Sequence, residues 1–290
     1  MIRIAFLLVT VALPAAATAQ TPPKVTATPL VQREHISIRD EGGRGPIVIL
    51  IPGLSSPRAV WDGAVPALTK RHRVLTVQVN GFAGDDPRAN LKPGILDGIV
   101  ADLDAYIVAN RLSAPAVVGH SMGGLVGMML TKAHPTHVGR LMIVDSLPYI
   151  GDLFLPGVTV AQVEPRARAM RDAMAAGYGK PADIAAAQAT ASTLALTPEA
   201  RAKVAEWVLK TDARVSAAAL YEDMTTDLRP DVAGFALPIT IVYPAPGEAL
   251  YRGAYAKAPR VTYAPVADAR HFVMLDQPAA FAKALDDFLK

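Results

Sequence analysis

The sequence contains no cysteine among its 290 residues. It can therefore form no disulfide bond, use no thiolate nucleophile and bind no zinc through cysteine. A lipid anchor behind a signal peptide is excluded as well, because that anchor requires a cysteine. Charged residues are sparse at 19%, and the net charge is +3. Since Lys and Arg do not gather on any predicted face, the composition does not favour nucleic-acid binding.

The first nineteen residues have the pattern of a secretory signal peptide. Arg3 gives a positive start, Ile4 to Leu13 is an apolar segment, and Ala17-Thr18-Ala19 is a small-x-small cleavage site. The apolar segment is shorter than the roughly 20 residues needed to span a bilayer. We expect cleavage near Ala19 and a mature protein in the periplasm or the medium, without stable membrane insertion.

Short apolar runs alternate with helical patterns along most of the remaining chain. The predicted strands are residues 47–51, 73–79, 116–118, 141–144, 239–243 and 261–263. Between them, Ile95, Ile99, Leu103 and Ile107 recur every four residues, as on the buried side of a helix. This alternation predicts an α/β fold with a mostly parallel sheet covered by helices on both faces. In such sheets the chemistry lies at the carboxyl ends of the strands.

Other elements are expected at the two ends and in the middle of the chain. Apolar and polar residues alternate in part over residues 30–39, as in an edge strand, and residues 40–45 are predicted to form a turn. A helix is expected over residues 59–70, and a closing helix carries Phe281, Leu285 and Phe288 on one face. Residues 148–226 are alanine-rich and helical in pattern, so we predict a helical cap inserted between two strands.

The segment Gly119-His120-Ser121-Met122-Gly123 has the form Gly-x-Ser-x-Gly between a predicted strand and a predicted helix. A serine in such a turn sits on a sharp bend, and its hydroxyl stands clear of the sheet. Glycine at both flanks suits the tight turn. The start of the helix also directs backbone N–H groups to the place where an oxyanion forms. We interpret Ser121 as a nucleophile.

The sequence resembles the α/β-hydrolase family over nearly all of the expected mature chain. The likeness is carried by the serine motif, by Ile49-Leu50-Ile51-Pro52-Gly53-Leu54 as the oxyanion loop, and by His271-Phe272 before Asp276-Gln277-Pro278. It implies an α/β-hydrolase core of residues 20–147 and 227–290 around the cap at 148–226, with the signal peptide at 1–19. The cap then follows the sixth core strand.

The resemblance implies a role for each matched position. Ser121 would attack a carbonyl, and His271 would take the serine proton and return it to the leaving group. The backbone N–H groups of Leu54 and Met122 would form the oxyanion hole. Family members usually have His-Gly in the oxyanion loop, whereas this chain has Pro52-Gly53. The resemblance implies no cofactor and no metal.

The acid that completes the triad is left open by the sequence. The family usually places an Asp a few residues past the strand that ends here at Tyr243, but this chain has none there. Glu248 follows slightly late and is long enough to reach. Asp145, at the end of the strand before the cap, is the other candidate, although an Asp at that position can simply cap a turn.

Several further residues are assigned ordinary structural positions. His120 is expected to point away from the nucleophile. The remaining histidines at 35, 72, 134 and 137 lack metal-ligand spacing, and Asp85-Asp86 reads as a solvated loop. Trp61 fits core packing or a pocket wall. Asp227 and Arg229 lie where the cap rejoins the sheet and can pin that joint.

The sequence favours a serine hydrolase that cleaves a carboxylic ester of a small or medium hydrophobic substrate through an acyl-enzyme. Amide, lactone or carbon–carbon bond cleavage uses the same groups, and the sequence does not separate them. The alternative is a non-catalytic ligand-binding or interaction protein on the same fold, which the missing Asp after Tyr243 favours. The partner is a small molecule in the first case. Oligomeric state cannot be inferred from these patterns.

Overall fold

The computed structural model describes residues 30–290, so the predicted signal peptide lies outside the described residues. An eight-stranded sheet has the order β1-β2-β4-β3-β5-β6-β7-β8. β1 and β2 run antiparallel to their neighbours, and the other strands are parallel to one another. The strands are β1 (Val31–Gln32), β2 (Ile36–Gly42), β3 (Ile47–Ile51), β4 (Arg73–Val79), β5 (Ala116–His120), β6 (Arg140–Val144), β7 (Ile239–Pro244) and β8 (Val261–Val266).

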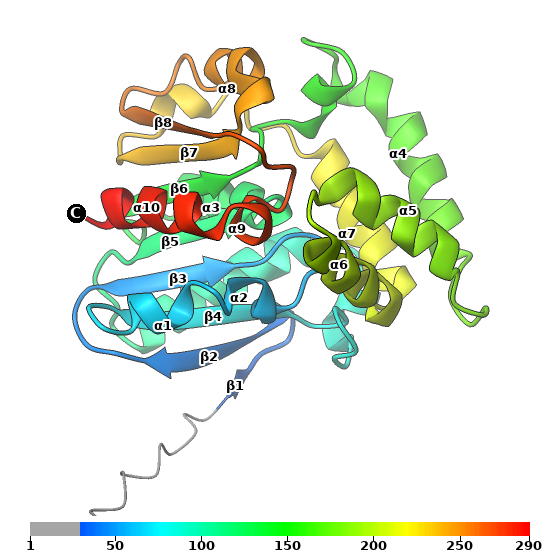
Figure 1. The fold of residues 1–290 in the computed structure, drawn as a ribbon, viewed down its shortest axis with the longest axis horizontal. Helices are drawn as coiled ribbons and strands as arrows, with labels where there is room; N and C mark the ends of the chain where they lie inside the picture. The colour runs from blue at the N-terminus through cyan, green and yellow to red at the C-terminus, as the bar shows by residue number, and fades with distance from the viewer. Residues whose placement is uncertain (1–29) are drawn as a thin grey trace, which may run out of the picture.

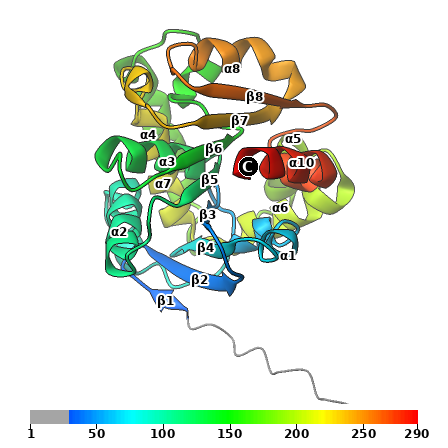
Figure 2. The same ribbon diagram turned by 90° about the vertical axis from the view of Figure 1, so that its left-hand side faces the viewer.

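Helices cover both faces of this sheet (Figure 1, Figure 2). One face carries α2 (Ile95–Ala109), α3 (Met122–Ala133) and α8 (Glu248–Ala254). The other carries α1 (Val65–Leu68), α9 (Val273–Asp276) and α10 (Pro278–Leu289). Along β3, Ile49 and Ile51 belong to the first core cluster, and Val48 and Leu50 to the second. Successive side chains of a strand point to opposite faces, so a strand covered on both sides must be apolar throughout.

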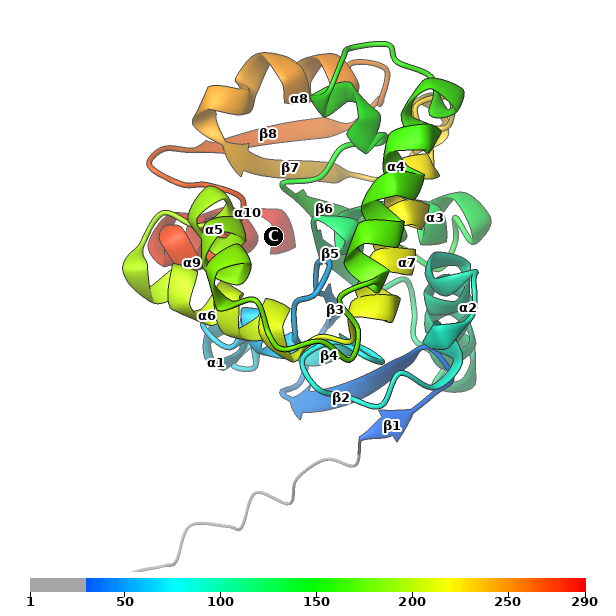
Figure 3. The same cartoon turned by 90° about the vertical axis from the view of Figure 1, so that its right-hand side faces the viewer.

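Between β6 and β7 the chain places four helices and the 3₁₀ segment η3 over the carboxyl ends of the strands (Figure 3). They are η3 (Ile150–Leu153), α4 (Val160–Ala175), α5 (Ile184–Leu194), α6 (Pro198–Lys210) and α7 (Ala213–Thr225). α5 and α6 share the core cluster of α9 and α10, with Trp207 beside Phe272. α4 and α7 pack around Tyr149 in a smaller cluster. The predicted fold class, including the helical insertion after β6, is confirmed.

Arg229 joins the two ends of the inserted segment. Its guanidinium donates to Asp152 at 2.8 Å, where the insertion begins, and to Asp227 at 2.5 Å, where it ends. The same group donates to the carbonyl of Val158 at 2.9 Å and lies 4.3 Å from the ring centre of Tyr149. A planar guanidinium suits such a junction, because its donors reach several acceptors at once.

Two local predictions are wrong in detail. The helix expected over residues 59–70 is interrupted, leaving the 3₁₀ segment η1 (Arg58–Trp61) and the short α1. Pro66 lacks the N–H that would bond to the carbonyl of Asp62, so a continuous helix cannot pass through it. The turn expected from Asp40 is still strand, because β2 continues through a bulge to Gly42, where φ is +89°.

The remaining short segments are η2 (Arg88–Leu91), η4 (Val232–Gly234) and η5 (Ala245–Gly247). The predicted edge strand over residues 30–39 is divided into β1 and β2, which pair with each other. Within the described part of the chain, none of the helices is long and apolar enough to cross a membrane.

Candidate active site

Ser121 lies on the bend between β5 and α3. Its φ of 54° and ψ of −125° are unusual for a residue with a side chain. A Cβ on Gly119 would come 2.1 Å from the carbonyl oxygen of Gly123, and a Cβ on Gly123 would come 2.5 Å from that of Ile51. Only glycine fits at these two positions. The backbone N–H of Ser121 donates to Val144 at 2.9 Å, which ties the bend to the neighbouring strand.

His271 lies in the loop between β8 and α9 and contacts Asp145, the first residue after β6. The distance from His271 Nδ1 to Asp145 Oδ2 is 2.5 Å. The hydroxyl of Tyr251 donates to the other oxygen of the same carboxylate. Burial acts to raise the pKa of Asp145, but the hydrogen bonds from His271 and Tyr251 outweigh it and hold this pKa below its usual value. Asp145 is therefore an ionised group that orients the imidazole.

Glu248, the other predicted candidate for the acid, is engaged elsewhere. One of its oxygens accepts a hydrogen bond from Tyr243 at 2.5 Å, and the other pairs with Arg252. The bond from Tyr243, followed by that from Arg252, lowers the pKa of this carboxyl. The Glu248 side chain is 41% exposed and lies on the outer side of α8. The structure brings Asp145 to His271 and leaves Glu248 at the surface.

Ser121 and His271 line the same cavity, which has a volume of about 260 Å³. Within residues 30–290 the His271 ring makes its hydrogen bond through Nδ1. This leaves the other ring nitrogen, Nε2, for an interaction with Ser121. Catalytic hydrogen bonds in ligand-free enzymes are often long and tighten only when substrate binds. Much of the wall is apolar, and the lining residues are Ser121, Asp145, Ser146, Leu147, Ile150, Leu153, Asp223, Pro244, Gly247, Leu250, Tyr251 and His271.

The loop after β3 lies directly against the serine bend. A Cβ on Gly53 would come 3.0 Å from the Cβ of Ser121, so glycine is needed for this approach. Met122 is the first residue of α3, and its N–H is one of the donors that a helix leaves without an internal partner. Met122 follows Ser121 in the chain, and Leu54 follows the Gly53 that approaches it. Neither Leu54 nor Met122 is among the residues that line the cavity.

His120, the residue before Ser121, contacts the loop that carries His271. Its Nε2 lies 3.0 Å from the carbonyl oxygen of His271, and a carbonyl can only accept, so Nε2 carries the proton. Burial, with a contribution from His271, lowers the pKa of His120 to about 3. The ring also packs 4.8 Å from Phe272. A neutral, buried imidazole in this position fixes the backbone of His271 and does not take part in proton transfer.

Asp223 is a cavity residue that the sequence analysis missed. It lies on α7, is 6% exposed, and lines the cavity that contains Ser121 and His271. Within residues 30–290 its carboxyl has no hydrogen-bond partner. Burial raises the pKa of Asp223 to about 7, although His271 acts to lower it. The sequence did hold a signal, because Asp223 continues the buried i, i+4 stripe of Val215 and Ala219.

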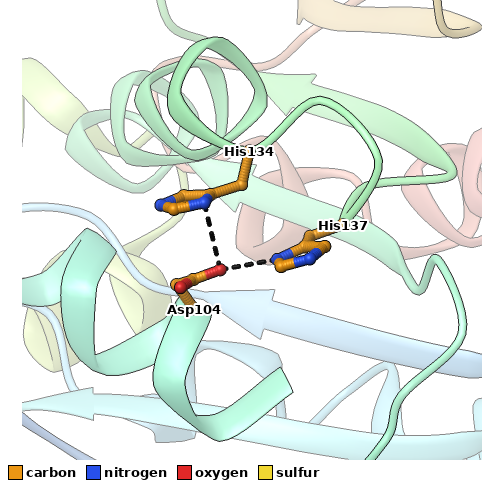
Figure 4. A group of neighbouring side chains, drawn as sticks. All are labelled: Asp104, His134 and His137. Atoms are coloured by element: carbon orange, nitrogen blue, oxygen red, sulfur yellow. Dashed lines mark hydrogen bonds and ion pairs between the residues drawn. The ribbon is translucent and has the colours of Figure 1, made fainter. Parts of the chain in front are cut away.

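A second group of ionisable side chains lies away from the cavity, where α2 meets the end of α3 (Figure 4). His134 Nδ1 and His137 Nδ1 lie 3.3 Å and 2.5 Å from the same oxygen of Asp104. The sequence spacing of the two histidines did not predict this group, since its third member comes from α2. Its donor atoms lie within 4.8 Å of one another, close enough to share a cation. The contacts with Asp104 already account for the arrangement.

The remaining predicted residues occupy ordinary positions. Trp61 is completely buried in the core cluster with Phe281, so core packing explains it and a pocket wall does not. Asp85 and Asp86 lie on an exposed loop, as expected.

The chain is similar to several known proteins. A model described as the alpha/beta hydrolase family matches residues 48–284. Over 106 residues the chain is 35% identical to a pimeloyl-[acyl-carrier protein] methyl ester esterase from Aeromonas hydrophila. That match covers 37% of this chain and 40% of the esterase, so it spans less than half of that relative's length.

Two solved structures share the fold at lower identity. The enol-lactonase from Burkholderia xenovorans LB400 has a TM-score of 0.71 and 21% identity, over 88% of this chain and 96% of that one. A thermophilic esterase from Thermogutta terrifontis, solved with malate bound, has a TM-score of 0.75 and 18% identity, over 90% and 98%. At these identities the likeness establishes the fold alone.

The unpartnered Asp223 predicts a stability effect that depends on pH. Its pKa is about 7 in the folded state, so the protein loses stability as pH rises from about 4 to 7 and this carboxyl ionises. Asp223→Asn should therefore stabilise the protein more at pH 8 than at pH 5, by up to about 3 kcal/mol. The free energy of unfolding in urea at both pH values measures this difference.

Glu206→Gln is the matched control for that experiment, because Glu206 is 56% exposed on α6 and pairs with the exposed Lys210. Exposed pairs of this kind contribute little. An equal effect of Asp223→Asn at the two pH values would show that the carboxyl is not an isolated buried acid.

Proposed function

The chain belongs to the alpha/beta hydrolase family, and we propose that it is a serine hydrolase that cleaves a carboxylic ester of a small or medium hydrophobic substrate through an acyl-enzyme. Ser121 is the nucleophile, His271 the general base and Asp145 the acid that orients it. The observation that carries the proposal is the 2.5 Å contact between His271 and Asp145 beside the strained Ser121, within one cavity.

The proposed reaction has two halves, each with two proton transfers through His271. As Ser121 Oγ forms a bond to the ester carbonyl carbon, its proton passes to His271 Nε2. The carbon–oxygen bond to the alcohol then breaks, and the same proton goes to the departing alcohol. In the second half, water gives a proton to His271 Nε2 as its oxygen forms a bond to the acyl carbon. The bond between that carbon and Ser121 Oγ then breaks, His271 returns the proton to Oγ, and the acid is released. Asp145 stabilises the imidazolium that forms in both halves of the reaction.

Backbone donors are proposed to stabilise the tetrahedral intermediates. The N–H groups of Leu54 and Met122 belong to the loop and the helix start that flank Ser121. Losing one such donor typically lowers the rate by on the order of 10²–10³. His120 contributes by holding the carbonyl of His271 at 3.0 Å. No cofactor or metal is needed for these steps.

Two observations support an ester with a hydrophobic group. Leu147, Ile150, Leu153 and Leu250 supply much of the cavity wall, and a volume of about 260 Å³ suits a small or medium ligand. The named relatives include a methyl ester esterase and a thermophilic esterase, and the enol-lactonase acts on a cyclic ester by its name. The non-catalytic alternative rested on the lack of an acid after β7, and Asp145 removes that reason.

Export is a further part of the proposal. The charged start, the apolar segment of residues 4–13 and the Ala17-Thr18-Ala19 site favour removal of the first nineteen residues. The hydrolase would then act in the periplasm or the medium, as a protein without stable membrane insertion.

The first prediction from the proposed function concerns the nucleophile. A fluorophosphonate should form a stable adduct with Ser121, because the reagent mimics the tetrahedral intermediate and needs an activated hydroxyl. Mass spectrometry of the labelled peptide identifies the site. Labelling should disappear in Ser121→Ala and fall sharply in His271→Ala. A folded protein that stays unlabelled would contradict the proposed function.

The second prediction separates the two candidate acids. Asp145→Asn should lower kcat by on the order of 10⁴, by analogy with loss of the triad Asp in other serine hydrolases. Glu248→Gln is its matched control, since this carboxylate is 41% exposed and bonds to Tyr243 and Arg252. Turnover of a short-chain 4-nitrophenyl ester measures both. A large loss in the control instead of Asp145→Asn would reverse the assignment.

The third prediction concerns export. Expression of the full chain in a Gram-negative host should yield a mature protein that begins near Gln20, recovered from the periplasmic fraction or the medium. Intact mass and N-terminal peptide analysis determine the start. An unprocessed chain that retains Met1 in the cytoplasm would refute this proposal.

A further inference from the structure

Asp223 places a second carboxyl group in the cavity, and no side chain of residues 30–290 forms a hydrogen bond or an ion pair with it. The first carboxyl, that of Asp145, is matched by His271 and Tyr251. Asp223 enters from α7, is 6% exposed, and has no hydrogen-bond partner among residues 30–290. None of the residues that line the cavity is Lys or Arg. Among residues 30–290 the basic side chain in the lining is His271, which already contacts Asp145.

A buried carboxyl without a partner is costly, because it loses the hydrogen bonds that water would give it. The other two residues of this buried stripe, Val215 and Ala219, are apolar. Such an exception to the pattern of a helix is expected where the group has a ligand to bind. Because Asp223 lines the cavity, a molecule that occupies the cavity can supply these donors.

We propose that Asp223 binds a protonated amine of the ligand, so that the cavity selects esters that carry an ammonium group. This deepens the proposed function, since it names the substrate class of the same site. An ionised carboxylate only accepts hydrogen bonds, and an ammonium offers three donors together with the opposite charge. The alkyl part of the ligand lies against Leu147, Ile150 and Leu250.

The same charge disfavours acidic ligands. A ligand carboxylate would face Asp145 and Asp223 in a cavity whose lining contains no Lys or Arg. Like charges in a poorly solvated cavity repel strongly. The esters that fit are therefore those of amino acids or of amino alcohols, with an aliphatic segment between the amine and the ester.

Equilibrium binding tests the subsite without any reaction. The protein with Ser121→Ala is titrated with pentylammonium chloride and with 1-pentanol at pH 8 by calorimetry. The ammonium ion should bind roughly 10-fold tighter or more, as expected of a charge-assisted hydrogen bond. The preference should fall to within about 2-fold when Asp223→Asn is added. Adding Glu206→Gln instead should leave the preference intact.

Turnover of matched esters gives the second test. The acyl series compares ethyl 6-aminohexanoate with ethyl heptanoate, and the alcohol series compares 2-(dimethylamino)ethyl butanoate with 3-methylbutyl butanoate. In at least one series kcat/KM should favour the amine, and Asp223→Asn should remove that preference. Glu206→Gln should retain it, because that carboxylate lies outside the cavity.

The two proposals fail in different ways. If Ser121 is labelled and neutral esters are hydrolysed, but pentylammonium binds no better than 1-pentanol, the amine subsite is refuted and the hydrolase stands. If pentylammonium binds through Asp223 while Ser121 resists labelling, the subsite stands and the hydrolase is refuted. A preference that survives Asp223→Asn would also overturn the subsite.

Discussion

The close approach of the chain around Ser121 is the constraint on which the rest of the site depends. The end of β5, the start of α3 and the loop after β3 meet so tightly that a methyl group at Gly119, Gly123 or Gly53 would overlap a neighbour. Packing therefore holds Ser121 at φ 54°, where a side chain is rarely found. The surrounding sheet compensates this strain, because its strands are buried on both faces and cannot shift independently.

The contact between His271 and Asp145 joins parts of the chain that are 126 residues apart. It spans the sheet from the end of β6 to the loop after β8, and Tyr251 of α8 completes it from a third direction. Asp145 stands one strand earlier than the position where the family usually places its acid. In its usual place the chain has η5 and α8, and Glu248 at the start of α8 accepts a hydrogen bond from Tyr243 of β7. Tyr243 and Tyr251 stack with their ring centres 4.6 Å apart. Their hydroxyls bond to Glu248 and Asp145, respectively.

Much of the fold could be predicted from the sequence because its signals are local. Apolar runs predicted the parallel strands. The stripe of Phe281, Leu285 and Phe288 predicted the last helix, and these three side chains are buried. The prediction of one helix over residues 59–70 was wrong because Pro66 interrupts the helical hydrogen bonds despite the apolar pattern. The choice between Asp145 and Glu248 depended on distances across the sheet, which no local pattern contains. The group at Asp104 was missed for the same reason, since its members come from separate segments. Asp223 continues a local buried stripe, but the cavity that it lines is formed by distant segments.

The order of the groups along the chain has an evolutionary consequence. Ser121 and Asp145 follow adjacent strands that pair directly, His120 opposite Val144, and both precede the insertion. Asp223 lies inside the insertion, and Arg229 closes it. Recombination that exchanged this module would replace the recognition of a molecule while leaving the hydroxyl and its carboxylate aligned. Substrate selectivity and reactivity can then evolve separately, so that the bound molecule changes while the reacting groups stay the same.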